Sequence, residues 1–409
     1  MRIWAFPSFY PYDAPGYTYS GIFAHRQYKG LIANGADLEV ICPMSWAPPF
    51  PFSLLHPEWK ELNKIVFPEE RVYDGIKVHH PRIANMKPSR FVKKTYEERY
   101  VDCIVAFFKR KNITLSPQTD VFYSQWLPSS RMVTMAAHKL GVKSAVLSIG
   151  DDVVLWPNSS SHNMQLFKQM LHDADYVFSC AEYLGKLANK TLGEEIPFGI
   201  ARWGVDHDFF KPVSHEVKEE LRKAYNIPAD RVTILNIGTA TPRKGWIDLF
   251  DALARIKQQG IDFVLLAVHT GKPEFDFASE TAKRGLTDNF IDIGEMKPTA
   301  LAKIYNLSDI FCLPSHSEGL ANVVVEAMSC GLPVITTIVG GHSELITNDV
   351  NGILIPPQAP DLLYEQLLPL VTDNAKRTAL GKAARSHIVN VWGNYAKSTE
   401  ELYQKICKV

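Results

Sequence analysis

The sequence carries no net charge, because its 44 lysine and arginine residues are balanced by 44 aspartate and glutamate residues. A chain without a basic excess has no overall field that attracts nucleic acid, so any anionic ligand must be held by charges that gather locally. The charge balance therefore argues against nucleic acid as a partner.

Cysteine is scarce and scattered. The sequence has no C-x-x-C pair and no cysteine clustered with histidine, which disfavours both a zinc site and a disulfide framework. This usage is typical of a protein of the reducing cytoplasm. The six cysteines are Cys42, Cys103, Cys180, Cys312, Cys330 and Cys407.

Long apolar runs are also absent. A membrane-spanning helix needs about 18 or more consecutive apolar residues, whereas the longest clean runs are pieces such as FVLLAV at 263–268. The N-terminal stretch MRIWAFPSFYPYDAPG lacks the continuous apolar segment of a secretory signal. We therefore expect a mature cytoplasmic protein without a membrane span.

The stretch RFVKKTYEERYVDCIVAFFKRKN at 90–112 is basic and amphipathic. It has two interpretations. Either it is a surface helix that packs by its apolar side, or it lies on the anionic inner face of a membrane, as suits an enzyme with a lipid-linked substrate.

Short β-rich apolar runs alternate with segments of helical period, the pattern of βαβ units and parallel sheets. The pattern occurs twice, so the sequence predicts an α/β protein with two Rossmann-like sheets. The first series is MRIWAF, LEVICP, IKVHHP, VFYSQW, SAVLSI, YVFSC and PFGIARW. The second series is VTILNIGT, FVLLAV, FIDIGE, IFCLPS and PVITTIV.

The two series are separated by a polar stretch at 208–231 that contains two prolines and one amphipathic helix. We place the hinge near 205–215. The expected organisation is a first domain at 1–207, a second at 208–385, and a terminal segment at 386–409 that is helical by period.

The stretch EGLANVVVEAMSCG at 318–331 follows a predicted strand. Glu318 lies in the loop before a helix that we expect from about Leu320 to Cys330, with Gly331 in the left-handed position after its end. Ligands of open parallel sheets bind at such loops, and the free backbone N–H groups of a helix start favour an anion or a polyhydroxylated ligand. The N–H groups concerned are those of Gly319, Leu320, Ala321 and Asn322.

Glu326 lies in the apolar run VVVEAM, where an unpaired carboxylate would be costly, so it needs a partner. Extending the helical period back to Glu318 puts the two carboxylates about 80° apart, which lets both face one cleft at different depths. The alternative is that Glu318 only complements the helix N-terminus and Glu326 is a solvated helix residue.

The stretch NIGTATPRKGWIDLFDAL at 236–253 predicts a strand that ends at Gly238, a loop, and a helix after Gly245. The loop carries the adjacent cations Arg243 and Lys244, which are suited to clamp a diphosphate, although such pairs are often only solvated. Taken with the carboxylates and amides of 318–326, these cations describe a nucleotide-sugar pocket.

Several segments resemble the retaining glycosyltransferases of the GT-B fold, family four. SHSEGLANVVVEAMSCGLPVI, followed by VGGHSELI and NGILI, is similar to the signature block of that family, in which two glutamates are separated by seven residues. The other matching segments are IGTATPRKGWIDL, DNFIDIGEMKPTALAKIYNLSDIFCLPS, ARWGVDHDFFKP, SGIFAHRQYKGLIANGADLEVICP and WGNYAKSTEELYQKI.

The resemblance implies two Rossmann-like domains facing a central cleft, an acceptor in the first domain, a donor in the second, and a C-terminal helix that crosses back to the first. It implies transfer of a sugar from a nucleotide-diphosphate sugar to a glycan, lipid-linked or small-molecule acceptor, as in polysaccharide biosynthesis. Retention would proceed through an oxocarbenium-like transition state, with the leaving phosphate helping to deprotonate the acceptor. No metal is required, and the nucleotide sugar is a co-substrate.

The resemblance also implies roles for single residues. Arg243 and Lys244 would neutralise the diphosphate leaving group, which is electrostatic stabilisation of developing charge. Glu318 would contact the transferred sugar, and Glu326 would bind the ribose hydroxyls. Further donor contacts are expected from Gly21, Gly238, Gly319, Leu320, Ala321 and Asn322, with base contacts around Ile293 and Met296.

Two positions depart from the family pattern. Thr239 stands where relatives have an arginine, which leaves Arg243 and Lys244 to supply the positive charge. Ile149 stands where relatives often have a histidine that contacts the donor sugar. Asp152 matches the family aspartate and has two interpretations, a loop cap or an acceptor contact. The D-H-D at 206–208 falls in the interdomain segment, so it does not predict a metal site.

Two other kinds of function stay open from the sequence. The same fold supports nucleotide-sugar epimerases and phosphorylases, and a chain without the histidine can be a non-catalytic nucleotide-sugar-binding subunit. Products formed from labelled donors distinguish these possibilities from transfer.

Overall fold

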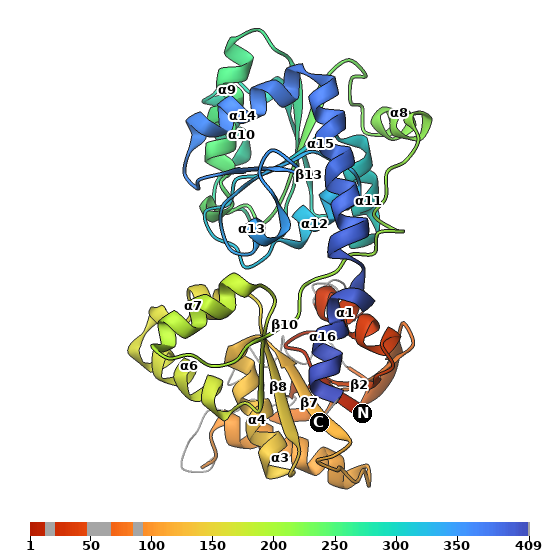
Figure 1. Ribbon diagram of the computed structural model, residues 1–409, viewed down its shortest axis with the longest axis vertical. Helices are drawn as coiled ribbons and strands as arrows, with labels where there is room; N and C mark the ends of the chain where they lie inside the picture. The colour runs from red at the N-terminus through yellow and green to blue at the C-terminus, as the bar shows by residue number, and fades with distance from the viewer. Residues whose placement is uncertain (13–20, 47–66, 85–92, 408–409) are drawn as a thin grey trace, which may run out of the picture. The chain divides into compact units, whose positions relative to one another are not determined.

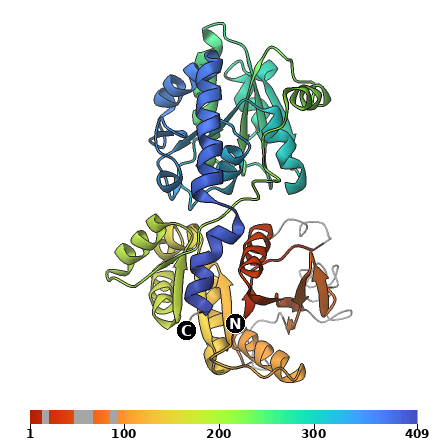
Figure 2. The same ribbon diagram turned by 45° about the vertical axis from the view of Figure 1, so that its right-hand side comes forward.

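The computed structural model describes residues 1–12, 21–46, 67–84 and 93–407. The chain forms two compact units, both visible in Figure 1 and Figure 2. The first unit comprises Met1–Cys180, Leu184–Arg202 and Ser398–Val409, and the second comprises Ala181–Tyr183 and Trp203–Lys397. Much of the C-terminal helix α16 (Tyr395–Cys407) therefore belongs to the first unit, where Asn34 donates to the Thr399 hydroxyl at 3.1 Å.

Each unit is built on a largely parallel sheet, and the predicted α/β fold with two Rossmann-like domains is confirmed. Within the described residues, the first sheet has the order β10-β9-β8-β7-β1-β2-β5-β4, with β4 antiparallel to β5. Its strands are β1 (Arg2–Phe6), β2 (Asp37–Ile41), β4 (Glu70–Tyr73), β5 (Ile76–His79), β7 (Asp120–Gln125), β8 (Lys143–Ser148), β9 (Tyr176–Ser179) and β10 (Gly199–Ile200).

The second sheet is parallel throughout its described strands and has the order β13-β12-β11-β14-β15-β16. The chain first builds outwards from β11 to β13 and then outwards on the other side from β14 to β16. The direction of winding therefore reverses between β11 and β14. Its strands are β11 (Val232–Ile237), β12 (Phe263–Val268), β13 (Phe290–Gly294), β14 (Ile310–Leu313), β15 (Val334–Thr337) and β16 (Ile353–Ile355).

Helices cover both faces of the second sheet. Figure 1 shows α9, α10 and α14 on one side and α11, α12 and α15 on the other. The bounds are α8 (His215–Ala224), η3 (Pro242–Lys244), α9 (Trp246–Gln258), α10 (Phe277–Ala282), η4 (Thr287–Asn289), α11 (Pro298–Leu307), α12 (Asn322–Ser329), α13 (His342–Leu345), α14 (Pro360–Thr372), α15 (Asn374–His387) and η5 (Ile388–Trp392).

The remaining helices lie earlier in the chain. They are α1 (Ile22–Ala33), α3 (Tyr96–Arg110), α4 (Leu127–Lys139), α5 (Asp151–Val154), η2 (Pro157–Ser159), α6 (Ser161–Asp173) and α7 (Glu182–Leu192). A small pair of strands, β3 (Met44–Trp46) and β6 (Arg82–Ala84), forms a separate parallel ribbon.

The cores explain why the longest apolar runs were readable as strands. Every residue of β12, FVLLAV, is buried, as expected for a central strand covered by helices on both faces. In the second unit, Trp246, Leu249 and Phe250 of α9 pack in the same cluster as Phe263 and Leu265 of β12.

Four strands were missed by the sequence analysis: β3, β4, β6 and β16. β4 alternates exposed and half-buried residues, and β3, β6 and β16 contain only three residues each. β4 and β16 are edge strands, and β3 and β6 pair only with each other. Such short or exposed segments carry little of the apolar signal that identifies a strand.

Helix α3 lies in the basic amphipathic stretch, of which residues 90–92 fall outside the described part of the chain. It starts with a capping box between Thr95 and Glu98. Its apolar residues Ile104, Phe107 and Phe108 are buried in the core of the first unit. The interpretation of α3 as a surface helix accounts for this packing. Among the described residues, none of the helices has the length and the apolar character needed to cross a membrane.

Candidate functional site

The charged residues predicted from the sequence gather where the winding of the second sheet reverses. Arg243 and Lys244 follow β11, and Glu318 follows β14, and these two strands are neighbours. In parallel strands the carboxyl ends share one edge, so the two loops emerge side by side. This is the switch point at which open α/β sheets bind their ligands.

The loop after β11 is held tightly against the loop after β14. The backbone N–H of His316 donates to the Arg243 carbonyl at 2.7 Å, and the Arg243 guanidinium donates back to the Ser317 carbonyl at 3.0 Å. Gly245 has a φ of 70°, and a Cβ there would lie 1.9 Å from the Pro314 carbonyl oxygen. Only glycine allows the two loops to approach this closely.

Lys244 and Glu318 form a direct ion pair. The distance between Lys244 Nζ and Glu318 Oε1 is 2.6 Å, and the Ser315 hydroxyl donates to the same oxygen at 2.7 Å. The lysine stem runs across Gly238, where an added Cβ would lie 3.4 Å from Cγ and Cδ of Lys244. Two predicted site residues separated by 74 positions are thus in contact.

The environment of Glu318 favours its charged form. Burial by itself would raise the pKa of this carboxyl, since only 8% of the residue is exposed. The Lys244 ammonium and the Ser315 hydroxyl outweigh burial and hold the pKa of Glu318 below its ordinary value. A carboxylate and an ammonium therefore lie together at the switch point at neutral pH.

The predicted row of backbone donors follows Glu318. Helix α12 begins at Asn322, two residues later than the sequence suggested, with Ala321 extended as its N-cap. Within the described part of the chain, the N–H groups of Gly319, Leu320, Ala321 and Asn322 have no hydrogen-bond acceptor. They remain available to a ligand at the start of the helix.

The late start of α12 corrects one geometric expectation. Glu318 lies in the loop and not on the helix, so the angle of about 80° obtained from the helical period does not apply. The backbone N–H of Gly341 donates to the Gly319 carbonyl at 2.6 Å, and a Cβ on Gly340 would lie 2.2 Å from that oxygen. The loop after β15 therefore holds Gly319 outside the helix.

Glu326 is buried, with 3% of the residue exposed, so it is not a solvated helix residue. The Tyr305 hydroxyl, from the end of α11, donates to Glu326 Oε2 at 2.9 Å. The sequence required a partner for this carboxylate, and Tyr305 is one that the sequence did not identify. A ribose would be a further partner of Glu326, and that role stays a prediction.

Two other side chains next to the Lys244–Glu318 pair were missed. His316 pairs with Asp248 of α9 at 2.8 Å. His342, fully buried, contacts the Thr337 carbonyl through Nδ1 at 3.1 Å, and burial lowers its pKa, so it is neutral at neutral pH. The position of neither histidine in the sequence indicates a role in the site. Ser315 could have been found, because it stands three residues before Glu318, which is a usual spacing for a local hydrogen bond from a hydroxyl group.

The predicted base contacts lie further along the sheet. Ile293 is in β13 and Met296 follows it, at the same carboxyl edge but two strands away from β11. Both are partly buried. No described contact joins them to Lys244 or Glu318, so their role in base binding stays a prediction.

Gly21 and Asp152 belong to the first unit. Gly21 is the N-cap of α1 with a φ of 74°, and a Cβ there would lie 2.0 Å from the Phe9 carbonyl oxygen. Position 21 requires glycine for two reasons, its positive φ and the close approach of the loop after β1. Contact between Gly21 and a donor phosphate stays a prediction.

Asp152 is completely buried and lies in the first turn of the short helix α5, directly after the loop that follows β8. Its oxygens accept hydrogen bonds from the backbone N–H groups of Leu127 at 3.1 Å, Gly150 at 2.7 Å and Ile149 at 3.1 Å. The loop-cap interpretation accounts for all of these contacts. Ile149 uses its backbone here and supplies no polar side chain in place of the histidine of the family.

We expect Asp152→Asn to lower the free energy of unfolding by about 1–3 kcal/mol, because an amide NH₂ would face backbone donors that now bind a carboxylate oxygen. Burial raises the pKa of Asp152 from 3.8 to about 6. The folded state thus holds a proton that the unfolded chain has released, so the contribution of Asp152 to stability falls as pH rises from about 4 to about 6.

Denaturant unfolding at several pH values measures both effects. Asp173→Asn, at an exposed position of α6, is the matched control and should leave stability unchanged. Equal stability of Asp152→Asn and the wild type at every pH would show that these hydrogen bonds do not hold the loop.

Among the described residues, no group of three or more histidine, cysteine, aspartate or glutamate side chains is arranged to hold a metal ion. The sequence-predicted residues instead offer two cations, two separately partnered buried carboxylates and a row of backbone donors. This set is suited to an anionic ligand with hydroxyl groups.

Comparisons with known proteins find similarity to glycosyltransferases. Residues 217–387 match the family model described as glycosyl transferases group 1. The whole chain is 26% identical to TuaC of Bacillus subtilis (strain 168), a glycosyltransferase named for teichuronic acid biosynthesis, and the alignment covers 100% of this chain and 99% of TuaC.

Solved structures share the fold over the full length. Sucrose-phosphate synthase from Thermosynechococcus elongatus gives a TM-score of 0.76 at 18% identity and covers 99% of each chain. Anabaena Alr3699/HepE, in complex with UDP and glucose, gives a TM-score of 0.75 at 16% identity and covers 100% of each chain. At such identities the likeness shows the fold alone.

Proposed function

We propose that this chain, whose residues 217–387 match the group 1 glycosyltransferases and whose fold is that of the GT-B glycosyltransferases, transfers a sugar from a nucleotide-diphosphate sugar to a hydroxyl group with retention of the anomeric configuration. The observation that carries the proposal is the Lys244–Glu318 pair at the switch point of the second sheet. It joins a cation for the diphosphate to a carboxylate for the sugar at the edge where ligands of this fold bind.

In this proposal the diphosphate binds at Lys244 and Arg243. The Lys244 ammonium lies 2.6 Å from Glu318, which balances its charge while no donor is bound. An incoming diphosphate brings its own negative charge and draws the ammonium towards it. The backbone N–H groups of Gly319 to Asn322 then add neutral donors that point at the same anion.

The glycosidic bond breaks as negative charge grows on the leaving phosphate. Cations that are already in position lower the energy of that charge more in the transition state than in the ground state, which is the condition for catalysis. Glu318 keeps Lys244, and the Ser317 carbonyl keeps Arg243, at the site before the donor binds, so both cations are close to the diphosphate when it arrives.

The two carboxylates have separate roles in this account. Glu318 contacts the hydroxyls of the transferred sugar next to the breaking bond. Glu326, oriented by the Tyr305 hydroxyl at 2.9 Å, binds the ribose hydroxyls and contributes to affinity. The acceptor is a glycan, a lipid-linked sugar or a small molecule with a free hydroxyl.

We further propose that transfer needs no metal ion, because Arg243 and Lys244 supply positive charge beside the diphosphate. The chelator EDTA should therefore leave the rate unchanged. A rate that falls with EDTA and returns with added Mg²⁺ or Mn²⁺ would contradict this part of the proposal.

A thermal-shift screen against UDP, GDP, ADP and their sugars tests donor binding. A ligand that binds only the folded state raises Tm by mass action, by an amount that grows with its concentration above Kd. UDP is the first candidate, because the structurally similar HepE was solved with UDP and glucose. We expect one base to raise Tm clearly more than the others.

Labelled donors then test the reaction. The account predicts that the labelled sugar moves to an added acceptor with the same anomeric configuration, which ¹H NMR reports directly. Recovery of the epimerised nucleotide sugar, or of a sugar phosphate formed from a glycan and inorganic phosphate, would instead identify an epimerase or a phosphorylase.

A further inference from the structure

A hollow of about 550 Å³ lies at the opposite edge of the second sheet. It is lined by residues that immediately precede strands, such as Asp309 before β14 and Pro333 before β15, and by one face of α15. In parallel strands these residues mark the amino edge, whereas Lys244 and Glu318 mark the carboxyl edge. The hollow is therefore separate from the site described above.

The walls of the hollow are strongly cationic. Among the described residues, its lining contains four cations, Lys218, Arg377, Lys382 and Arg385, and one carboxylate, Asp309. This is an excess of three positive charges in a chain whose total charge is zero. Such a local concentration of one sign is the electrostatic condition for binding an anion.

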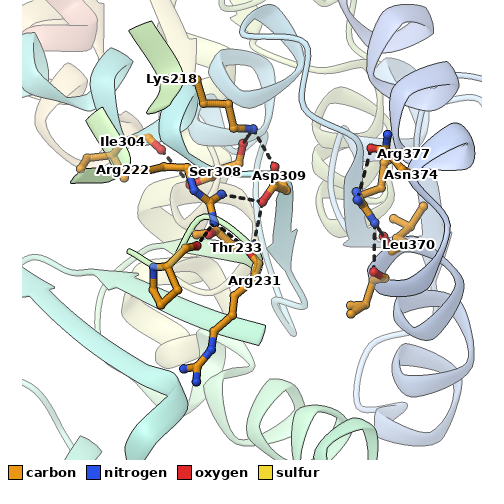
Figure 3. Close-up of polar contacts among 12 residues, drawn as sticks. Lys218, Arg222, Arg231, Thr233, Ile304, Ser308, Asp309, Leu370, Asn374 and Arg377 are labelled. Carbon is orange, nitrogen blue, oxygen red and sulfur yellow. Dashed lines mark hydrogen bonds and ion pairs between the residues drawn. The ribbon is translucent and has the colours of Figure 1, made fainter. Parts of the chain in front are cut away.

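The one carboxylate is already fully engaged. Asp309 Oδ1 lies 2.6 Å from Lys218 Nζ, and Oδ2 lies 3.0 Å from the Arg222 guanidinium. Figure 3 shows Lys218 and Arg222 converging on Asp309, with Arg377 on the neighbouring helix α15. Burial alone would raise the pKa of Asp309, but these cations lower it, so it stays charged and does not balance the other cations.

The two arginines of α15 are held in place by neutral groups. Arg377 donates to the carbonyls of Leu370 at 2.8 Å and Val371 at 3.0 Å, at the end of α14. Arg385 donates to the carbonyls of Phe210 at 3.0 Å and Ser329 at 2.8 Å. Within the described residues neither has a carboxylate within ion-pair distance, so each guanidinium is fixed by neutral groups and not by an ion pair.

Lys382 of α15 also lines the hollow. It is exposed and has no ion-pair partner among the residues described. The floor below it is close-packed backbone, because a Cβ on Gly381 would lie 2.2 Å from the Gly331 carbonyl oxygen. Of the lining cations that the structure describes, Lys382 is the exposed one without an ion-pair partner, so it can move towards a ligand.

We propose that this hollow binds a small phosphorylated molecule whose phosphate group lies between Arg377, Lys382 and Arg385. Fixed guanidinium groups suit the planar pairs of oxygens on a phosphate, and a mobile ammonium adds a point charge. The volume falls within the range of about 300–1,000 Å³ that is usual for small-molecule sites. Leu332, Val389 and the prolines at 212 and 333 give part of the lining an apolar surface for the rest of the molecule.

Inorganic pyrophosphate is the probe for this site, with binding to the full chain measured by isothermal titration calorimetry. Because pyrophosphate can also bind at Lys244, the titration is made in a Lys244→Gln background. We expect Lys382→Glu to weaken the remaining binding about tenfold or more, since a charge within reach of the anion is reversed. High salt should weaken binding in the same way.

Lys376→Glu is the matched control, with the same charge change on an exposed position of the same helix outside the hollow. It should change the dissociation constant less than about twofold, because distant surface charges are screened. Arg377→Gln is a second test within the hollow, and its unfolding curve shows whether the fold is kept.

Equal binding by Lys382→Glu, Arg377→Gln and Lys376→Glu would overturn the proposal, as would no pyrophosphate binding in the Lys244→Gln background. Vesicles that contain phosphatidylglycerol form a further arm. If they bound through Lys382 while pyrophosphate did not bind, the hollow would be part of a membrane contact and the proposal would be wrong. None of these outcomes depends on sugar transfer.

Discussion

Replacing Lys244 by glutamine is expected to slow sugar transfer about 10²- to 10³-fold, the usual cost of losing one preorganised donor to developing negative charge. Lys244 connects the loop after β11 with the loop after β14, because its stem crosses Gly238 and its ammonium contacts Glu318. The loss should fall mainly on kcat, since the leaving phosphate gains its charge only as the bond breaks.

The same change should also show how much Lys244 stabilises the buried Glu318 carboxylate. Without Lys244 the buried carboxylate loses its counterion, so we expect the free energy of unfolding to fall by about 3 kcal/mol at neutral pH. The folded-state pKa of Glu318 lies below its ordinary value of 4.5, so the pair stabilises the fold above that pH and its contribution is lost as pH falls further. The difference from the wild type should therefore shrink in acid.

Lys244→Arg and Lys303→Gln are the controls. The first keeps the positive charge and should restore a large part of the rate. The second removes a lysine from an exposed position of α11 and should change neither rate nor stability. A Lys244→Gln enzyme that keeps the wild-type kcat would remove this lysine from the mechanism.

Glu326→Gln is expected to weaken donor binding about 10- to 100-fold while kcat changes little. The variant loses a charged hydrogen bond to the ribose that the account places equally in the ground state and the transition state. Glu318→Gln should show the opposite division, with a lower kcat and a smaller change in donor affinity. Tyr305→Phe should resemble a milder Glu326→Gln, because the Tyr305 hydroxyl only orients the carboxylate.

Steady-state kinetics with varied donor separate these outcomes. Glu365→Gln, on the exposed side of α14, is the matched control for loss of a carboxylate. Equal losses of kcat in Glu318→Gln and Glu326→Gln, with unchanged donor affinity in both, would contradict the assignment of separate roles.

Much of the fold could be predicted because its central strands are continuous apolar runs. FVLLAV and VTILNI are buried along almost their whole length, so the sequence marks them without help from periodicity. The edge strands β4 and β16 are shorter or half exposed and carry no such mark. The start of α12 was placed too early because Leu320 and Ala321 are apolar, while contact between Gly319 and Gly341 keeps this loop outside the helix.

Part of the site was predictable by the same reasoning. Loops that follow parallel strands meet at one edge, so Arg243, Lys244 and Glu318 were expected to lie near one another. What the sequence does not contain is the order of the strands. The ion pair forms because β11 and β14 are neighbours in the sheet. In the sequence, 72 residues lie between Ile237, the last residue of β11, and Ile310, the first residue of β14.

The partners of the buried groups were not predictable. Tyr305 reaches Glu326 from another helix, and no spacing in IYNLSD distinguishes it from an ordinary core tyrosine. The cationic hollow depends in the same way on packing, since Lys218, Asp309 and the arginines of α15 come from distant parts of the chain. A neutral total charge conceals such a local excess.

A crystal structure of the protein with the nucleoside diphosphate that raises Tm most would test the central claim most directly. The account predicts the diphosphate beside the side chains of Lys244 and Arg243 and the N–H groups of Gly319 to Asn322, with the ribose hydroxyls on Glu326. A diphosphate bound elsewhere, with the Lys244–Glu318 pair unchanged and its surroundings empty, would contradict it.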